Sequence, residues 1–241
     1  MTHQTASTGR SILLRTDPHE CAYVPTRTAR LEFLSPTTPL DGHAYQRLLE
    51  QGFRRSGPYV YRPACPTCSA CQSLRIPTRH FRARRRHRRC LRDNADLRVH
   101  RAPPRIKDEH LALYRRYLRH RHPDSSMGEP DWAEAQGFLT ASWCPTVFYE
   151  LRTPDDARLL AVAVTDILPS AFSAVYTFFD PDLAHRGLGN LAILLQRAEA
   201  ARLSAPYLYL GYWIHDAPVM AYKAEFRPHE VFTPQGWRPV E

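Results

Sequence analysis

Four stretches of the chain place apolar residues three or four positions apart, as one buried face of a helix requires. They predict helices over residues 41–52, 107–122, 131–141 and 189–203. Asp41 is a favourable N-cap for the first helix, and Pro123 ends the second.

Shorter apolar runs bounded by proline, glycine or polar residues predict strands. They cover residues 31–34, 74–77, 146–151, 159–165, 173–179 and 207–210, and Gly211 is expected to end the last one. Within residues 173–179, alternation puts Ser173, Val175, Thr177 and Phe179 on one face and Ala174, Tyr176 and Phe178 on the other. The fold class is therefore α+β.

The order of these elements divides the chain. Residues 1–19 are expected to form a flexible tail, and residues 20–95 a small N-terminal domain that carries a cysteine cluster and a basic segment. Residues 96–241 form the second domain, which the last fifteen or so residues close as a tail.

The charge balance of +9 over 241 residues comes almost entirely from arginine, since Lys107 and Lys223 are the only lysines. Between Arg79 and Arg92 there are eight arginines and no acidic residue. Such a segment is either a solvated face or a surface for phosphates, and the lack of compensating acids favours nucleic acid. No apolar run approaches the roughly 20 residues that span a bilayer, and no signal-peptide core is evident, so we expect a cytoplasmic protein without membrane contact.

Three cysteines recur at two-residue intervals in Cys65-Pro-Thr-Cys68-Ser-Ala-Cys71, with Cys21 as a candidate fourth ligand. This spacing suits a tetrahedral zinc ion or part of an iron–sulfur cluster. Buried reduced thiols in a tight turn are the equally weighted alternative.

Aromatic and ionisable residues gather after the strand at 207–210 and predict the wall of a pocket. They are Tyr212, Trp213, His215, Asp216, Tyr222, Lys223 and Glu225. Asp180, which follows the strand at 173–179, is either a helix N-cap or a base, and Tyr176 either packs in the core or binds substrate.

The element order of residues 96–241 resembles the N-acetyltransferase-like (GNAT, acyl-CoA N-acyltransferase-like) fold. The sequence Arg186-Gly-Leu-Gly189 opens the long helix, where that fold binds a pyrophosphate.

Sequence motifs spread from Cys21 to Pro228 resemble the arginyl-tRNA–protein transferase family, most closely its bacterial branch, the aspartate/glutamate leucyltransferases. The matching stretches include Cys21-Ala-Tyr-Val-Pro, Gly52-Phe-Arg-Arg-Ser-Gly, Cys68-Ser-Ala-Cys, Tyr176-Thr-Phe-Phe-Asp-Pro and Met220-Ala-Tyr-Lys-Ala-Glu-Phe-Arg-Pro. The resemblance implies transfer of an amino acid from aminoacyl-tRNA, with leucyl-tRNA favoured, to the N-terminal amine of proteins that begin with Asp or Glu. It also implies N-end rule degradation of these proteins.

The ester of aminoacyl-tRNA is already activated, so neither ATP nor coenzyme A is required. Under this hypothesis Asp180 accepts a proton, and Tyr176, Tyr212 and Tyr222 position the substrate or stabilise the oxyanion. Lys223 and Glu225 are expected to form a structural ion pair. Candidate receptors for the acidic N-terminal residue are Arg27, Arg30, Arg54 and Arg75. The candidates for the tRNA acceptor stem are Arg82, Arg84, Arg85, Arg86, Arg88, Arg89 and Arg92.

Three alternatives stay open from the sequence: arginyl-tRNA as the donor, an N-acetyltransferase that uses acetyl-CoA, and a non-enzymatic nucleic-acid or metal-binding module. The donors are distinguishable by their pockets, because leucine requires an apolar pocket and arginine one with a carboxylate.

Overall fold

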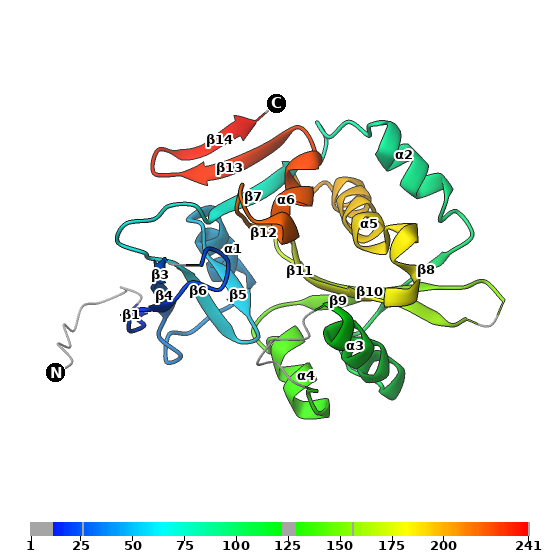
Figure 1. The fold of residues 1–241 in the computed structure, drawn as a ribbon, viewed down its shortest axis with the longest axis horizontal. Coiled ribbons are helices and arrows are strands. Elements are labelled where there is room, and N and C mark those ends of the chain that lie inside the picture. The colour runs from blue at the N-terminus through cyan, green and yellow to red at the C-terminus, as the bar shows by residue number, and fades with distance from the viewer. Residues whose placement is uncertain (1–11, 26, 122–128, 156, 241) are drawn as a thin grey trace.

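The computed structural model describes residues 12–25, 27–121, 129–155 and 157–240, and a large mixed sheet runs through this part of the chain (Figure 1). In spatial order its eight strands are β14 (Gly236–Val240), β13 (His229–Thr233), β7 (Gln72–Pro77), β12 (Tyr207–Trp213), β11 (Ala171–Phe179), β10 (Leu159–Ile167), β9 (Thr146–Arg152) and β8 (Arg98–Ala102). Neighbouring strands are antiparallel except for β11 and β12, which are parallel.

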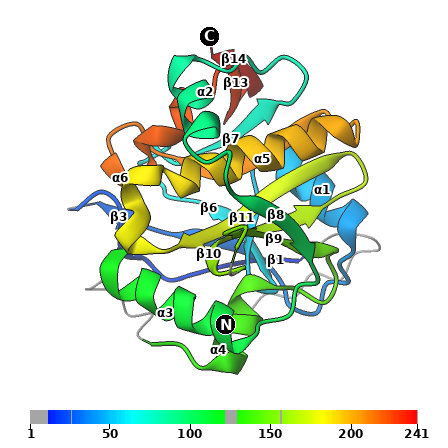
Figure 2. The same cartoon turned by 90° about the vertical axis from the view of Figure 1, so that its right-hand side faces the viewer.

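Helices cover both faces of this sheet (Figure 1 and Figure 2). The helices are α1 (Gly42–Glu50), α2 (Arg85–Arg92), α3 (Asp108–Arg121), α4 (Trp132–Leu139), α5 (Leu188–Arg202) and α6 (Pro218–Ala221), with the 3-10 segments η1 (Pro181–Arg186) and η2 (Tyr222–Glu225). Helix α5 packs on the face that carries Phe172 and Leu208, and α2 lies beside α5. Helices α3 and α4 pack on the opposite face, against Val162 and Phe178. The described residues contain no helix with the length and apolar character needed to cross a bilayer.

The four predicted helices are present, and their caps explain where two of them begin. The Asp41 carboxylate accepts a hydrogen bond from the backbone N–H of Ala44, and Asp131 forms a capping box with Glu134. Helix α3 is described as far as Arg121, so the predicted end at His122 lies outside the described residues.

A second sheet packs beside the first and is formed by β1 (Leu13–Arg15), β4 (Leu31–Leu34), β6 (Tyr59–Pro63) and β5 (Arg54–Ser56). Strands β2 (His19–Glu20) and β3 (Thr28–Ala29) pair separately. Residues 1–11 of the predicted tail lie outside the described residues. The predicted flexibility is wrong for the tail residues of β1, because the backbone of this strand pairs with β4 and Leu13 lies opposite Leu34.

Strand β7 joins the two halves of the chain, because it lies between β12 and β13 in the large sheet. Ile76 lies opposite Leu208, and Leu74 lies opposite Val231. A strand from the predicted N-terminal domain therefore completes the sheet of the second domain, and the boundary at residue 95 stays a prediction. The expected C-terminal tail is wrong, since β13 and β14 form a hairpin within the sheet.

A β-bulge in β11 changes which side chains share a face. Tyr176 lies opposite Val164 in β10, whereas Ala174 lies opposite Thr165, so Val175 is the extra residue. Phe172 and Phe179 both pack against α5 although they are an odd number of positions apart. The predicted alternation across residues 173–179 is therefore wrong beyond the bulge.

Strands β11 and β12 pair only over three residues, from Ala171 opposite Tyr207 to Ser173 opposite Tyr209, and then they part. The prediction that Gly211 ends the last strand is also wrong, because β12 continues to Trp213. Gly211 has φ 71° at an irregularity in the pairing with β7, a conformation that glycine adopts without strain.

Candidate active site

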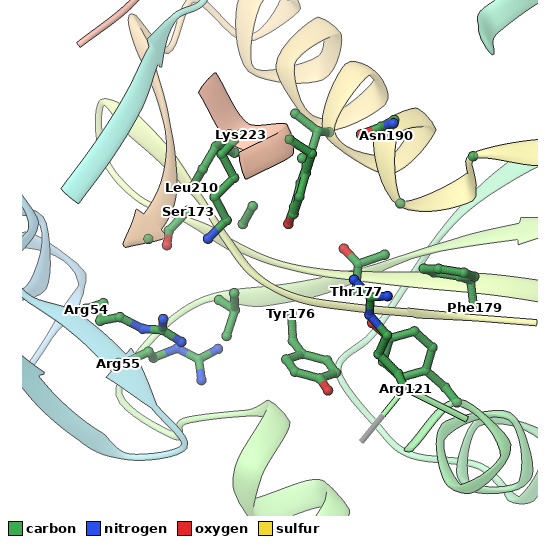
Figure 3. A pocket seen from close by; sticks show the side chains of 18 of the residues that line it. Arg54, Arg55, Arg121, Ser173, Tyr176, Thr177, Phe179, Asn190, Leu210 and Lys223 are labelled. Atoms are coloured by element: carbon green, nitrogen blue, oxygen red, sulfur yellow. The ribbon is translucent and has the colours of Figure 1, made fainter. Parts of the chain in front are cut away.

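A cavity of about 500 Å³ opens where β11 and β12 part, and we call it the strand-end cavity (Figure 3). Its walls come from β11, β12, β5, the first turn of α5 and segment η2, with further residues from α1 and α3. Its apolar lining residues include Tyr45, Leu49, Val175, Ile193 and Leu210.

The charge of the strand-end cavity is entirely positive. Arg54, Arg55, Arg121 and Lys223 line it, and no Asp, Glu or His is among its lining residues in the described part of the chain. Arg55 is neutralised by a buried ion pair in which Nε and Nη2 each lie 2.7 Å from a carboxylate oxygen of Asp166. Arg54 and Arg121 have no carboxylate at ion-pair distance among the described residues, so the cavity is suited to an anion.

Arg54 is held by aromatic rings. Its guanidinium lies 5.6 Å from the ring centre of Tyr61 and 5.5 Å from that of Tyr212. Within the described residues no carboxylate lies at ion-pair distance from Arg54. Cation–π contacts fix the guanidinium and leave its N–H donors available to a ligand.

Lys223 enters the same cavity from η2, and its Nζ donates a hydrogen bond of 2.7 Å to the carbonyl oxygen of Tyr212. Burial first, and the Arg54 guanidinium second, lower the pKa of Lys223 to about 7. The predicted ion pair between Lys223 and Glu225 is wrong, because Glu225 pairs with Arg86 on α2.

Two of the four predicted catalytic residues line the strand-end cavity, namely Tyr176 and Tyr222. Burial raises the pKa of Tyr222 to about 12 and also raises the pKa of Tyr176. The ring of Tyr176 packs edge-on against Tyr114 and Tyr117 of α3. Both hydroxyls therefore stay protonated at neutral pH and can serve as hydrogen-bond donors.

Asp180 and Tyr212 do not line the cavity. The Asp180 carboxylate caps η1 by accepting from the N–H of Asp182, and it also accepts from Arg116 Nη2 at 2.8 Å. The Tyr212 hydroxyl donates to the carbonyl oxygens of Gly52 and Tyr61, which ties β12 to the second sheet. Of the two roles the sequence allowed for Asp180, this geometry favours the cap.

The predicted substrate-binding arginines separate into three environments. Arg54 alone lines the strand-end cavity, while Arg27 and Arg30 line a second cavity beside the cysteines. Arg75 lies in β7, stacked 3.7 Å from the ring centre of Tyr207, and its Nε lies 2.7 Å from Glu230 Oε2. Arg75 is thus engaged within the sheet.

All four predicted metal-ligand cysteines line this second cavity of about 540 Å³: Cys21, Cys65, Cys68 and Cys71. A set of thiols suits zinc or an iron–sulfur cluster. Among the described residues, however, only Glu109, His110 and Glu150 bring three ligand atoms within 4.8 Å of one another. The four sulfur atoms would have to move closer together to coordinate one ion, and metal binding stays a prediction.

The Arg27 guanidinium lies 3.1 Å from Cys68 Sγ. A hydrogen bond from the Ala70 backbone first, and Arg27 second, lower the pKa of Cys68, whereas burial raises the pKa of Cys71 to about 11. Cys68 is therefore the more acidic of these two thiols.

Two family models match the chain. The model for the N terminus of arginine-tRNA-protein transferase matches residues 19–89, and the model for its C terminus matches residues 109–233. The chain belongs to the arginine-tRNA-protein transferase family. The resemblance seen in the sequence motifs is confirmed.

Several relatives in this family are named aspartate/glutamate leucyltransferase. The chain is 69% identical over 235 residues to the one from Halorhodospira halophila, which covers 98% of this chain and 100% of that protein. Identity is 50% over 238 residues with the one from Alkalilimnicola ehrlichii, covering 96% of this chain and 99% of that protein. Identity is 47% over 222 residues with the one from Pseudomonas savastanoi pv. phaseolicola, covering 92% of this chain and 94% of that protein.

Solved structures match more distantly. The C-terminal domain of a lysylphosphatidylglycerol synthetase from Agrobacterium fabrum matches with a TM-score of 0.49 and 14% identity, over 80% of this chain and 62% of that chain. The L-PGS structure from Bacillus licheniformis matches with a TM-score of 0.47 and 11% identity, over 70% of this chain and 58% of that chain.

In this member of the transferase family the seven predicted tRNA-binding arginines are all exposed, and we call them the arginine row: Arg82, Arg84, Arg85, Arg86, Arg88, Arg89 and Arg92. Five of them line a groove of about 570 Å³ along α2. A hollow of about 210 Å³ shares Arg86 and Arg89 with this groove, and it shares Gly187 and Asn190 with the strand-end cavity. This hollow, a depression over the start of α5, therefore borders both the arginine row and the strand-end cavity.

Several residues that line the strand-end cavity were not among the predicted site residues, including Tyr23, Tyr45, Arg121, Ser173 and Asn190. The buried pair of Arg55 and Asp166 was not predicted, because the predicted strand stops at residue 165 whereas β10 extends through Asp166 to Ile167. The adjacent residues Arg54 and Arg55 at the start of β5 are a signal for this pair. Consecutive residues of a strand point to opposite faces, so one of the two arginines is expected to point into the core.

Proposed function

We propose that this aminoacyl-tRNA–protein transferase moves leucine from leucyl-tRNA to the N-terminal α-amine of proteins that begin with Asp or Glu. The observation that carries the proposal is the charge of the strand-end cavity: its described lining residues include Arg54 and Arg121, neither of which has a carboxylate partner among the described residues, and include no carboxylate. Family membership supplies the reaction class, and the relatives named aspartate/glutamate leucyltransferase agree with this donor and acceptor.

The composition of the cavity favours leucine over arginine as the transferred residue. An arginine side chain would need a carboxylate partner once it left water, and the lining supplies none. The leucine side chain needs only apolar contact, which residues such as Leu49, Val175 and Leu210 provide.

The acidic N-terminal residue of the protein substrate is received by Arg54. Its guanidinium is oriented by Tyr61 and Tyr212 and faces the cavity without a carboxylate partner among the described residues. A planar fork of donors matches a carboxylate in a bidentate geometry. Arg27, Arg30 and Arg75 are less suited, because each lies outside this cavity.

The tRNA lies along the arginine row. Its acceptor stem contacts the exposed guanidinium groups of α2, and its terminal nucleotides pass through the depression over the start of α5. The aminoacyl ester then reaches the strand-end cavity past Gly187 and Asn190. Because aminoacyl-tRNA is the donor, the reaction is cytoplasmic.

A GNAT-like arrangement of residues 96–241 is consistent with the parting of β11 and β12 and with the glycines at the start of α5. The reaction itself needs neither ATP nor coenzyme A, since the ester carries the required energy. Tyr222 and Tyr176 are the hydroxyl donors available to a developing oxyanion. A zinc ion or cluster, if held by the four cysteines, would occupy the second cavity and support the fold there.

The test is a transfer assay with purified protein, leucyl-tRNA or arginyl-tRNA, and peptides that begin with Asp, Glu or Ala, read by mass spectrometry. We expect leucine on the Asp and Glu peptides only. Transfer of arginine instead would refute the donor assignment, and transfer from neither donor would refute the proposed reaction.

Arg54→Met tests the acceptor site. Loss of a charge-assisted hydrogen bond worth about 1.5–3 kcal/mol predicts a roughly 10- to 150-fold loss of kcat/KM for Asp and Glu peptides. Arg98→Met, on the exposed edge strand β8, is the matched control and should keep the wild-type value. Equal losses in both variants would show that Arg54 does not recognise the carboxylate.

A further inference from the structure

The strand-end cavity must remove a proton during the proposed transfer, because the attacking amine loses one when the amide bond forms. Few of its side chains can do so near neutral pH. Its arginines stay protonated, and no Asp, Glu or His is among its lining residues in the described ranges. Burial raises the pKa of each lining tyrosine: Tyr23, Tyr45, Tyr117, Tyr176 and Tyr222.

The remaining titratable side chain is the amine of Lys223. Figure 3 shows the side chain extending from η2 into the cavity, with its nitrogen on the side of Ser173 and Arg54. The hydrogen bond to the carbonyl oxygen of Tyr212 fixes Nζ beside the point where β12 leaves β11. No carboxylate lies at ion-pair distance from Lys223 among the described residues, so nothing there holds it in the charged form.

Among the charged groups around Lys223, Arg54 is the one that lowers its pKa. Arg54 faces it from β5, and Arg55 and Arg121 line the same cavity from β5 and α3. The pKa of about 7 follows from burial and from Arg54, so a large fraction of the amine is neutral at physiological pH. The pair formed by Arg86 and Glu225 is the nearest ion pair on its own segment and lies outside the cavity lining.

From this geometry we infer that Lys223 is the proton carrier of the transfer reaction. The α-amine nitrogen of the protein substrate attacks the ester carbonyl of leucyl-tRNA, and neutral Nζ of Lys223 takes a proton from that α-amine. The C–N bond forms, the bond between the carbonyl carbon and the ribose oxygen breaks, and the lysine ammonium returns the proton to that oxygen. The inference rests on the proposed function and adds a catalytic residue to it.

The acidic side chain of the substrate would assist this step. A carboxylate bound at Arg54 offsets the positive charge that lowers the pKa of Lys223. The pKa of the lysine then moves toward the α-amine value of about 7.7–8.0, which brings the two proton affinities closer. Recognition of the acidic residue and proton transfer are thereby coupled through Arg54.

The chain contains only two lysines, which makes a direct measurement possible. With 13C-lysine labelling, the Cε resonances can be followed by NMR across pH, and Lys107→Ala assigns them. Lys107 is exposed and serves as the internal reference. We expect the Lys223 resonance to titrate near pH 7 and the Lys107 resonance to titrate separately from it. A Lys223 resonance that titrates with Lys107 would overturn the inference.

The catalytic test is the single-turnover rate of leucine transfer from pH 6 to 9.5 for wild-type protein, Lys223→Ala and the control Lys107→Ala. The single-turnover rate of Lys223→Ala should be about 10²- to 10⁴-fold lower than that of the wild type, the range for general acid–base catalysis. This rate should rise with pH without levelling off near pH 7. Added methylamine should restore activity to Lys223→Ala in proportion to the concentration of neutral amine.

Lys107→Ala should keep the wild-type profile. Melting temperature and leucyl-tRNA binding of each variant show whether it is folded. If Lys223→Ala keeps the wild-type rate and inflection, or loses rate without any amine rescue in a folded, tRNA-binding protein, Lys223 is not the proton carrier. Absence of transfer by the wild-type protein would instead refute the proposed function itself.

Discussion

The buried ion pair between Arg55 and Asp166 gives the most quantitative prediction for stability. Both side chains are fully buried, and each of two guanidinium nitrogens lies 2.7 Å from a carboxylate oxygen. Thr146 donates a further hydrogen bond of 2.7 Å to the same carboxylate. The pair links β5 of the second sheet to β10 of the large sheet, so it fixes the packing of one sheet on the other.

Asp166→Asn keeps the size of the side chain and removes its charge. Arg55 would then be a buried cation whose other partners are the carbonyl oxygens of Gly57 and Leu139 and the hydroxyl of Thr146. Breaking a buried pair in this way costs about 3–5 kcal/mol. For a chain of this size, each kcal/mol lowers Tm by about 2–4 °C, so we expect a fall of roughly 6–20 °C.

The assay is urea denaturation followed by far-UV circular dichroism, with thermal unfolding as the second measurement. Asp182→Asn is the matched control, because the Asp182 side chain is 81% exposed and its pair with Arg116 is worth at most about 1 kcal/mol. The double variant Arg55→Met/Asp166→Leu should recover most of the loss, since it leaves no unpaired charge. A fall of less than about 1 kcal/mol for Asp166→Asn would refute this reasoning.

Three further predictions concern backbone strain, pH and salt. Gly57→Ala should lower the unfolding free energy more than Gly236→Ala. Both glycines have positive φ, but only at Gly57 would an added Cβ lie 2.6 Å from a backbone oxygen, that of Gly137. Equal losses of unfolding free energy in urea denaturation would contradict this prediction. Burial above all lowers the pKa of His229 to about 4, so the unfolded chain binds a proton there between pH 6.5 and 4 and the folded chain does not. The unfolding free energy should therefore fall as pH drops through that window, and His229→Gln should make it depend less on pH. Identical slopes of unfolding free energy against pH for the wild-type protein and His229→Gln would count against this prediction. Arg89→Gln should reduce the slope of log K against log salt for tRNA binding by about one unit, measured by filter binding, whereas an unchanged slope would place the tRNA elsewhere.

The sequence predicts well those elements whose signal is local. Helix α1 begins where Asp41 predicts it, and β4 spans the residues that its short apolar run indicates. Strand β8 gave no such signal, because four of its five residues are exposed at the edge of the sheet and need not be apolar. The hairpin of β13 and β14 was read as a tail for a similar reason, since β14 has no buried residue.

The candidate site was predicted only in part, because it is assembled from distant segments. Tyr222 and Arg54 could be nominated from motifs, and both line the strand-end cavity. Their meeting depends on where β11 and β12 part, which no local pattern encodes. Lys223 was assigned an ion pair with Glu225 from proximity in sequence, yet in the structure Glu225 reaches across to Arg86 on α2.

Strand β7 has a consequence for the synthesis of the protein. Ile76 pairs with Leu208, and Leu74 pairs with Val231, so the strand gains its neighbours only after most of the chain has left the ribosome. Until then an apolar strand has two open edges, which invite pairing with other chains. Contacts of such sequence separation also slow folding. A nascent chain stalled near residue 95 is therefore expected to depend on chaperones, and a fragment of that length is expected to aggregate when expressed alone.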